Sequence, residues 1–402
     1  MYRFVRAIML LAAGMMCQVY AQAQNAPRML IVNHNAIFNY ATFFQIEAGG
    51  NLTSPTLVST GGYGTSQENI GGVAAFHSTT QDCFFIADGA SNAVAAIDSD
   101  FNVIADFHAG PLDFGVNGLS LAVNKEFLYA GFGGNSQSGG NSRMASFRIE
   151  PGCNLEYLGS VPAVGLGSGI PNYLATRGKI LVVSYGDGSI ESFHFSKGLA
   201  QSNGDLQKTT GATKQLIAVS VDVSKDGTFA VFGDRDNVHG RPVVEVADIS
   251  SGKLGQPTVV YRLGSDFLLS TFVRLSPDES LLYLSGGEGG DPPLKTLGAA
   301  FFDRTTGTVK PGCFAPPLND PNQEWGFTTN VAFANNSKGL GATLYVMEVS
   351  VEFIGGNQSL ATVNVQSNGK SCSFQEAGNS PLTLESGSFD FGTITSSPPR
   401  TF

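Results

Sequence analysis

The sequence has 402 residues, a formal net charge of −10 and a charged fraction of only 14%. This acidity argues against nucleic acid or an anionic membrane surface as the main partner, because both are bound through basic faces. The 50 glycines and 29 phenylalanines are typical of a turn-rich all-β protein with a well-filled interior.

The first 23 residues have the three-part pattern of a secretory signal peptide. Arg3 and Arg6 form its basic segment, residues 7–16 its apolar segment, and Ala-Gln-Ala at residues 21–23 its cleavage motif. The apolar segment is too short to cross a bilayer, and no other run long enough for a membrane span follows it. We therefore expect the protein to be exported, either to a periplasm or out of the cell.

A strand–turn–strand phrase recurs along the rest of the chain. Its clearest copy, residues 271–287, reads Thr-Phe-Val-Arg-Leu-Ser-Pro-Asp-Glu-Ser-Leu-Leu-Tyr-Leu-Ser-Gly-Gly, in which a Pro-Asp turn separates two β-type runs. The run Leu-Leu-Tyr-Leu lacks alternation, which indicates a strand buried on both faces. Residues 221–234 repeat the phrase closely, and looser copies lie at residues 79–87, 124–130, 177–184 and 335–347. Units of roughly 45–50 residues with about four strands each predict β-propeller blades.

The repeats can be placed along a single domain, which we assign to residues 29–396. They cover residues 29–62, 71–111, 118–164, 172–211, 216–264, 267–318 and 330–378. The first repeat has only three strand-like segments, whereas residues 389–394 form a spare one near the C-terminus. Since a ring of blades exposes sheet edges unless its ends meet, we predict an all-β, seven-bladed β-propeller closed by this C-terminal strand, which completes the first blade. Residues 24–28 are then a linker and residues 397–402 a disordered tail, and we expect a monomer.

Four cysteines remain after the signal peptide, namely Cys83, Cys153, Cys313 and Cys372. None forms a Cys-x-x-Cys pair, so the sequence does not predict a zinc or redox motif. Cys153, Cys313 and Cys372 follow the third strand of their repeats, and equivalent positions on separate blades are expected to lie too far apart for a disulfide. Cys83 lies in an apolar strand and is expected to be a small core residue.

Two segments carry a resemblance to a known family. Residues 276–284 contain Ser-Pro-Asp followed by Leu-Leu-Tyr-Leu, and residues 183–193 read Val-Ser-Tyr-Gly-Asp-Gly-Ser-Ile-Glu-Ser-Phe. Both resemble the lactonase-type seven-bladed propellers, whose best-known members are 6-phosphogluconolactonases. The resemblance implies the seven-bladed fold over nearly the whole mature chain and a hydrolase that acts on lactones. The catalytic histidine and Asn-Glu pair of that family have no match at residues 271–273 and 285–287.

The loop at residues 233–241 has the highest density of reactive side chains. Asp234 and Asp236 supply carboxylates, His239 an imidazole and Arg241 a guanidinium. These groups could form an acid–base pair, bind an anion or bind a divalent cation. The simpler interpretation is a solvated loop whose charges pair with one another.

Three further candidates occupy corresponding loops of other repeats. His34 follows the first strand of the domain, Asp187 lies in a Gly-Asp-Gly turn, and Glu288 lies shortly after the predicted strand at residues 281–284. Alone, each is expected to be a structural or turn residue. Together, the acidic members would form a negative funnel that favours cations or polyhydroxylated ligands.

Two hypotheses for function follow. The first is an exported lactonase-like propeller that binds, and hydrolyses, a small polar ligand such as a sugar lactone at the mouth of the central channel. The second is a non-catalytic scaffold that binds a surface protein or glycan. The sequence shows no cofactor motif; a divalent cation at the 233–241 loop is the one cofactor that either hypothesis would accommodate.

Overall fold

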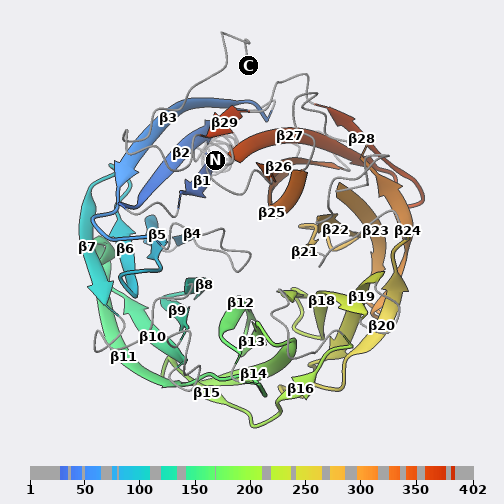
Figure 1. The fold of residues 1–402 in the computed structure, drawn as a ribbon, viewed down its shortest axis with the longest axis horizontal. Coiled ribbons are helices and arrows are strands. Elements are labelled where there is room, and N and C mark those ends of the chain that lie inside the picture. The colour runs from blue at the N-terminus through green and yellow to red at the C-terminus, as the bar shows by residue number, and fades with distance from the viewer. Residues whose placement is uncertain are drawn as a thin grey trace, which may run out of the picture.

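The computed structural model describes residues 28–384 apart from residues 35–37, 48–49, 65–74, 79–80, 109–118, 134–141, 168, 211–218, 237–240, 265–271, 286–296, 316–325, 336–340, 351–357 and 377–381. Its described strands form seven antiparallel sheets, and a single turn of 3-10 helix, η1 (Pro151–Cys153), is the one helical element among these residues. Figure 1 shows the sheets following one another around a ring in chain order. The expectation of an all-β, propeller-like fold is therefore confirmed.

Most sheets contain four strands in simple sequential order. The first three sheets contain β1 (Arg28–Asn33), β2 (Tyr40–Ile46) and β3 (Leu52–Ser59); β4 (Ala75–Ser78), β5 (Cys83–Asp88), β6 (Ala93–Ile97) and β7 (Val103–His108); and β8 (Leu119–Asn124), β9 (Phe127–Phe132), β10 (Arg143–Ile149) and β11 (Leu155–Pro162). The fourth and fifth contain β12 (Pro171–Arg177), β13 (Ile180–Tyr185), β14 (Ser189–Ser196), β15 (Leu199–Ser202) and β16 (Gln207–Lys208); and β17 (Ser220–Val223), β18 (Phe229–Asp236), β19 (Arg241–Asp248) and β20 (Thr258–Arg262). The last two contain β21 (Phe272–Leu275), β22 (Leu281–Ser285), β23 (Leu297–Asp303) and β24 (Thr308–Phe314); and β25 (Gly326–Asn335), β26 (Gly341–Ser350), β27 (Gln358–Ser367), β28 (Cys372–Glu376) and β29 (Leu382–Leu384).

The second strand of a four-stranded sheet is buried on both faces. All six residues of β5 and all five of β22 are buried, as the lack of alternation in their sequences predicts. The core lies between neighbouring sheets. For example, Phe85 of the second sheet packs in one cluster with Leu121 and Phe147 of the third. Burial of each such side chain contributes roughly 1.5–3 kcal/mol, so the contacts between sheets are a major source of stability.

The first sheet corresponds to the second, third and fourth strands of the other sheets. A recurring hydrogen bond shows this, because the residue after the outermost strand donates its backbone N–H to a carbonyl at the start of the third strand. The pairs are Ala163 with Ser142, Leu263 with Pro242, Ala315 with Leu297 and, in the first sheet, Thr60 with Asn39, each at 3.0 Å. Asn39 directly precedes β2, so β2 takes the place of a third strand. The position without a described strand is therefore the innermost one, beside β1.

The predicted closing strand, residues 389–394, lies outside the described residues. Among the residues that are described, Leu382–Leu384 form β29, which pairs with β27 of the seventh sheet. β29 lies beside the start of β27, at residues Gln358–Leu360, whereas β28 pairs with its later half. The first part of the C-terminal segment thus extends the last sheet.

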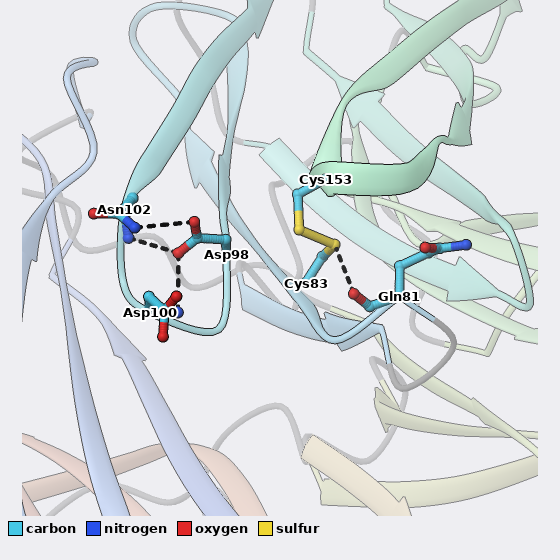
Figure 2. Close-up of a disulfide and its surroundings, with 6 residues drawn as sticks. All are labelled: Gln81, Cys83, Asp98, Asp100, Asn102 and Cys153. Atoms are coloured by element: carbon cyan, nitrogen blue, oxygen red, sulfur yellow. Dashed lines mark hydrogen bonds between the residues drawn. A yellow bond between two sulfur atoms is a disulfide. The ribbon is translucent and has the colours of Figure 1, made fainter.

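The expectation that the cysteines are unpaired was wrong. Cys83 is bonded to Cys153, with the Cα atoms 5.5 Å apart, and Cys313 is bonded to Cys372, with the Cα atoms 5.6 Å apart. Figure 2 shows the first bond bridging the start of β5 and the turn η1 that follows β10. The second joins β24 to β28, the outer strands of adjacent sheets. Equivalent positions on neighbouring blades come close where the outer strands or turns of the two sheets meet.

Among the described residues, no helix is long and apolar enough to cross a membrane.

Candidate functional site

The described candidate residues lie at equivalent places in three sheets. His34 follows β1, Asp187 follows β13, and Asp234 and Arg241 lie on either side of the connection from β18 to β19. β13 and β18 are the second strands of their sheets, and β1 occupies the equivalent place in the first sheet. β19 is a third strand. His239, Glu288 and the side chain of Asp236 lie outside the described part of the structure.

His34 forms a hydrogen bond with a neighbouring strand. Its Nε2 lies 2.6 Å from Oγ1 of Thr42, a fully buried residue of β2. Burial lowers the pKa of the imidazole to about 4, because a charged ring would lose its hydration there. His34 is therefore neutral at pH 7, and the described contact assigns it a structural role.

Asp187 organises the segment that leads into the fourth sheet. Its Oδ2 accepts hydrogen bonds from the backbone N–H of Gly167 at 2.5 Å and of Gly169 at 3.3 Å. Its Oδ1 accepts from the backbone N–H and the hydroxyl of Ser189, at 2.9 and 2.5 Å. A Cβ atom on Gly165 would lie only 2.5 Å from both carboxylate oxygens, so the loop is closed tightly around the side chain. Asp187 thus holds two segments of the same sheet together.

Asp234 and Glu245 form a buried carboxyl pair in the fifth sheet. Both side chains are fully buried, on the adjacent strands β18 and β19. Burial, together with the neighbouring charge of Asp234, raises the pKa of Glu245 to about 7. The backbone N–H of Thr210 donates to Glu245 Oε1 at 2.8 Å. Arg241, by contrast, is exposed.

A second buried carboxyl pair lies in the second sheet. Asp88 is the sixth residue of β5, as Asp234 is of β18, and it faces Asp106 of β7. Burial is the main cause that raises the pKa of Asp88 to about 7, and the Asp106 charge adds to it. Oδ1 of Asp88 accepts hydrogen bonds from Asn39 Nδ2 at 2.6 Å and Thr60 Oγ1 at 2.8 Å, both from the first sheet or the linker after it.

A further buried carboxyl, Glu191 of β14, was not among the sequence candidates. The Tyr185 hydroxyl donates to Glu191 Oε2 at 2.7 Å, and the Ser202 hydroxyl donates to Oε1. Burial raises the pKa of Glu191, while these two hydrogen bonds lower it. The sequence signal for this residue was a glutamate in the middle of a strand. The residues on either side of Glu191 in β14 are buried. Such a residue must be paired or hydrogen-bonded.

A groove lies away from all these residues, on the outside of the sixth and seventh sheets. It has a volume of about 620 Å³ and is lined by residues of turns and strands that include Asp278, Asp303, Arg304, Lys310 and Lys370. Asp278 and Asp303 already accept hydrogen bonds within their own turns. The groove is open and mixed in charge, and it contains none of the sequence candidates.

Comparison with known proteins places the chain by fold alone. No protein-family model matches the sequence, and no curated protein matches it either. A hypothetical selenium-binding protein from Sulfolobus tokodaii is similar in structure, with a TM-score of 0.58, 11% identity, and coverage of 88% of this chain and 91% of that one. A functionally unknown protein from Desulfotomaculum acetoxidans has a TM-score of 0.53 and 12% identity, over 80% of this chain and 92% of that one.

Proposed function

We propose that this protein is an exported, seven-bladed propeller that binds a glycan or protein of a cell surface, without catalysis, through the loops at the ends of its second strands. Two disulfides support export, because such bonds persist in oxidising compartments. The seven sheets around the ring in Figure 1 support the blade count.

One observation favours binding over catalysis. The described candidates for acid–base chemistry are engaged in contacts within the fold. Asp187 accepts four hydrogen bonds from its own sheet and the segment before it. His34, whose pKa is about 4, is too weak a base for efficient proton transfer at pH 7, where the best catalytic pKa lies near the working pH.

Lactone hydrolysis is the second candidate, and one feature favours it. Glu245 of β19 has a pKa of about 7, which suits a general acid or base, and it lies beside Asp234 of β18. Arg241, the first residue of β19, is exposed and could bind an anionic group of a substrate.

The two candidates are separated by measuring binding and turnover on the same protein. Labelled mature protein, residues 24–402, is applied to cells of the producing organism before and after glycosidase or protease treatment, and to a panel of lactones with proton release as the readout. The proposal predicts binding that one enzyme treatment removes and that weakens in Arg241→Ala, with no turnover. Lactone turnover that disappears in a folded Glu245→Gln variant would instead establish the hydrolase.

Closure of the ring has its own test. We infer that residues 385–396 continue from β29 to the open inner edge of β1. Ending the chain after Leu384 should then lower the thermal midpoint by many degrees, because β1 and the first sheet lose an edge partner. Ending it after Ser396 removes only the predicted tail and should change nothing. Equal midpoints for both truncations would refute the closure.

A further inference from the structure

Three oxygen atoms at the boundary between the first and second sheets are buried without a partner. They are Asn39 Oδ1, Asp88 Oδ2 and Asp106 Oδ1. Asn39 and Asp88 have no exposed surface at all. A buried polar atom without a hydrogen bond costs roughly 1–3 kcal/mol, so three of them at one place require an explanation.

The two carboxyl groups are close enough to influence each other, because the charge of Asp106 raises the pKa of Asp88, and burial raises the pKa of both. Two carboxylates offer only acceptors, so neither can satisfy the other while both are ionised. A proton on one oxygen turns that carboxyl into a donor toward the other. One proton therefore supplies partners for Asp88 Oδ2 and Asp106 Oδ1 together, and it removes the repulsion between two buried charges.

The surroundings contain little that could neutralise the pair instead. The titratable or charged groups on the elements packed around it are His77 of β4, His108 of β7, Arg28 of β1, His34 after β1, Tyr40 of β2 and Tyr63 of the linker after β3. His108 is exposed and bonded to the carbonyl of Ser91. Arg28 lies at the opposite end of β1 from Asn33, whose side chain reaches Ala87 beside Asp88. The charge that raises the pKa of Asp88 is that of Asp106, and none of the groups just named contributes to the shift.

We propose that Asp88 and Asp106 share one proton in weakly acidic solution, and that this proton stabilises the contact between the first and second sheets so that its loss as the pH rises to neutral and above loosens them. Asp88 is the residue through which the contact runs, because its Oδ1 accepts from Asn39 and Thr60, next to β2 and β3 of the first sheet, while the charge of Asp106 in the second sheet acts on its carboxyl group. Loss of the proton would leave a negative charge on both carboxyl groups. The two charges would repel each other in this buried site. The first sheet would then separate most easily from the second.

A proton explains the site better than a bound metal ion does. Calcium takes six to eight oxygen ligands, whereas two carboxyls and one carboxamide converge here. Among the described residues, no group of three or more His, Cys, Asp or Glu side chains is arranged to hold a metal ion. Gly62 also packs directly against Asp88, since a Cβ there would lie 2.5 Å from Oδ2.

The direction of the pH effect follows from the raised pKa of Asp88, about 7 against an ordinary value of 3.8. The folded protein keeps its proton at pH values where the unfolded chain has lost it. The stabilisation is therefore complete below about pH 4 and is lost as the pH rises toward about 7. The equilibrium constant for opening of this boundary should rise up to about tenfold per pH unit within that window.

The test compares the mature protein with Asp106→Asn and with Asp100→Asn, which makes the same change at an exposed turn of the same sheet. Thermal midpoints are measured from pH 4.5 to 8.5 in a chelator. Hydrogen exchange of β1 and β5, relative to β13, is measured at pH 6 and 8 after correction for the intrinsic rate. The unaltered protein and Asp100→Asn should lose midpoint with rising pH. Asp106→Asn should lose less, because its amide donates at every pH.

Hydrogen exchange of the unaltered protein keeps the test valid if Asp106→Asn does not fold. Protection of β1 and β5 should fall about tenfold or more from pH 6 to 8, while β13 changes little. Equal pH slopes in all three proteins would overturn the proposal. So would uniform loss of protection across the sheets, or an increase in midpoint with calcium that disappears in Asp106→Asn, which would show a cation in place of the proton.

Discussion

Removal of the Cys313–Cys372 disulfide should destabilise the protein by several kcal/mol. The bond joins β24 and β28, the outer strands of the sixth and seventh sheets, and the two cysteines are 59 residues apart in sequence. In the chain-entropy account, a crosslink stabilises by restricting the unfolded chain, and a loop of this length corresponds to about 4 kcal/mol at 25 °C. Unfolding entropy scales with chain length, so for a domain of this size about 4 kcal/mol corresponds to a midpoint lower by roughly 5 °C.

The measurement is thermal unfolding of the double variant Cys313→Ser/Cys372→Ser in a buffer that contains no added oxidant. The matched comparison is Cys83→Ser/Cys153→Ser, which removes a crosslink over 70 residues. The stabilisation that a crosslink gives by restricting the unfolded chain grows only with the logarithm of loop length. The loss of this restriction should therefore cost a similar free energy in both double variants. The second variant also leaves two serines in a buried site, because Cys83 is 0% and Cys153 3% exposed, so it should lose more.

The order of reduction gives an independent check. Cys313 and Cys372 are partly exposed, whereas Cys83 and Cys153 are buried. A thiolate reductant needs access to a sulfur atom, so mild reductant should open the Cys313–Cys372 bond first, as alkylation and mass spectrometry would show. A Cys313→Ser/Cys372→Ser midpoint within 1 °C of the parent, or preferential alkylation of Cys83 and Cys153, would refute this reasoning.

Two further substitutions test local structure. Asp187→Ala removes the acceptor of four hydrogen bonds and should cost about 2 kcal/mol in denaturant unfolding, with Asp187→Asn costing less because one acceptor oxygen remains; equal losses would contradict the assignment. Gly198 and Gly204 both have positive φ, +85° and +66°, but only a Cβ at Gly198 would enter the ring of Phe127. Gly198→Ala should therefore lower the free energy of unfolding by about 2–4 kcal/mol, against about 1 kcal/mol for Gly204→Ala. Similar values for the two variants would show that backbone strain alone causes the loss of stability.

The fold could be predicted because its signals are local. In the Ser-Pro-Asp-Glu turn, the Ser276 hydroxyl donates to Asp278 at 2.6 Å and Glu279 takes a positive φ of 59°. Such a turn between β-type runs forces a hairpin wherever it occurs. Repetition along the chain then indicates a ring of similar sheets. The absence of alternation in Leu281–Ser285 likewise predicted its burial on both faces.

The disulfides could not be predicted because their geometry depends on how neighbouring sheets meet. Repeat positions show that Cys313 and Cys372 occupy similar places in successive sheets. They do not show that the two outer strands approach within disulfide distance at the positions of these two cysteines. Cys83 belongs to a second strand, yet it bonds to Cys153 in a turn of the next sheet. The relevant contact lies between sheets, and no local pattern encodes it.

The candidate site was only partly accessible to sequence reasoning for a similar reason. Loop composition drew attention to residues 233–241, but the carboxyl with the pKa of about 7 is Glu245, which lies within the following strand. Its inward direction follows from the register in which Glu245 lies opposite Phe232. Asp88 is the last residue of β5, whereas Asp106, whose charge raises its pKa, comes from a strand two places away in the sheet.

Specific polar or covalent contacts join successive sheets along the ring. Asp88 connects the first and second sheets, Cys83–Cys153 the second and third, and the hydrogen bond from Leu254 to Asp205, at 2.7 Å, the fourth and fifth. Each sheet contacts mainly its neighbours, so these contacts determine how far local opening can spread. They lie within strands, linkers and outer turns. The loops proposed to bind a partner can therefore differ in sequence without loss of the ring, which is the division of roles expected of a binding scaffold.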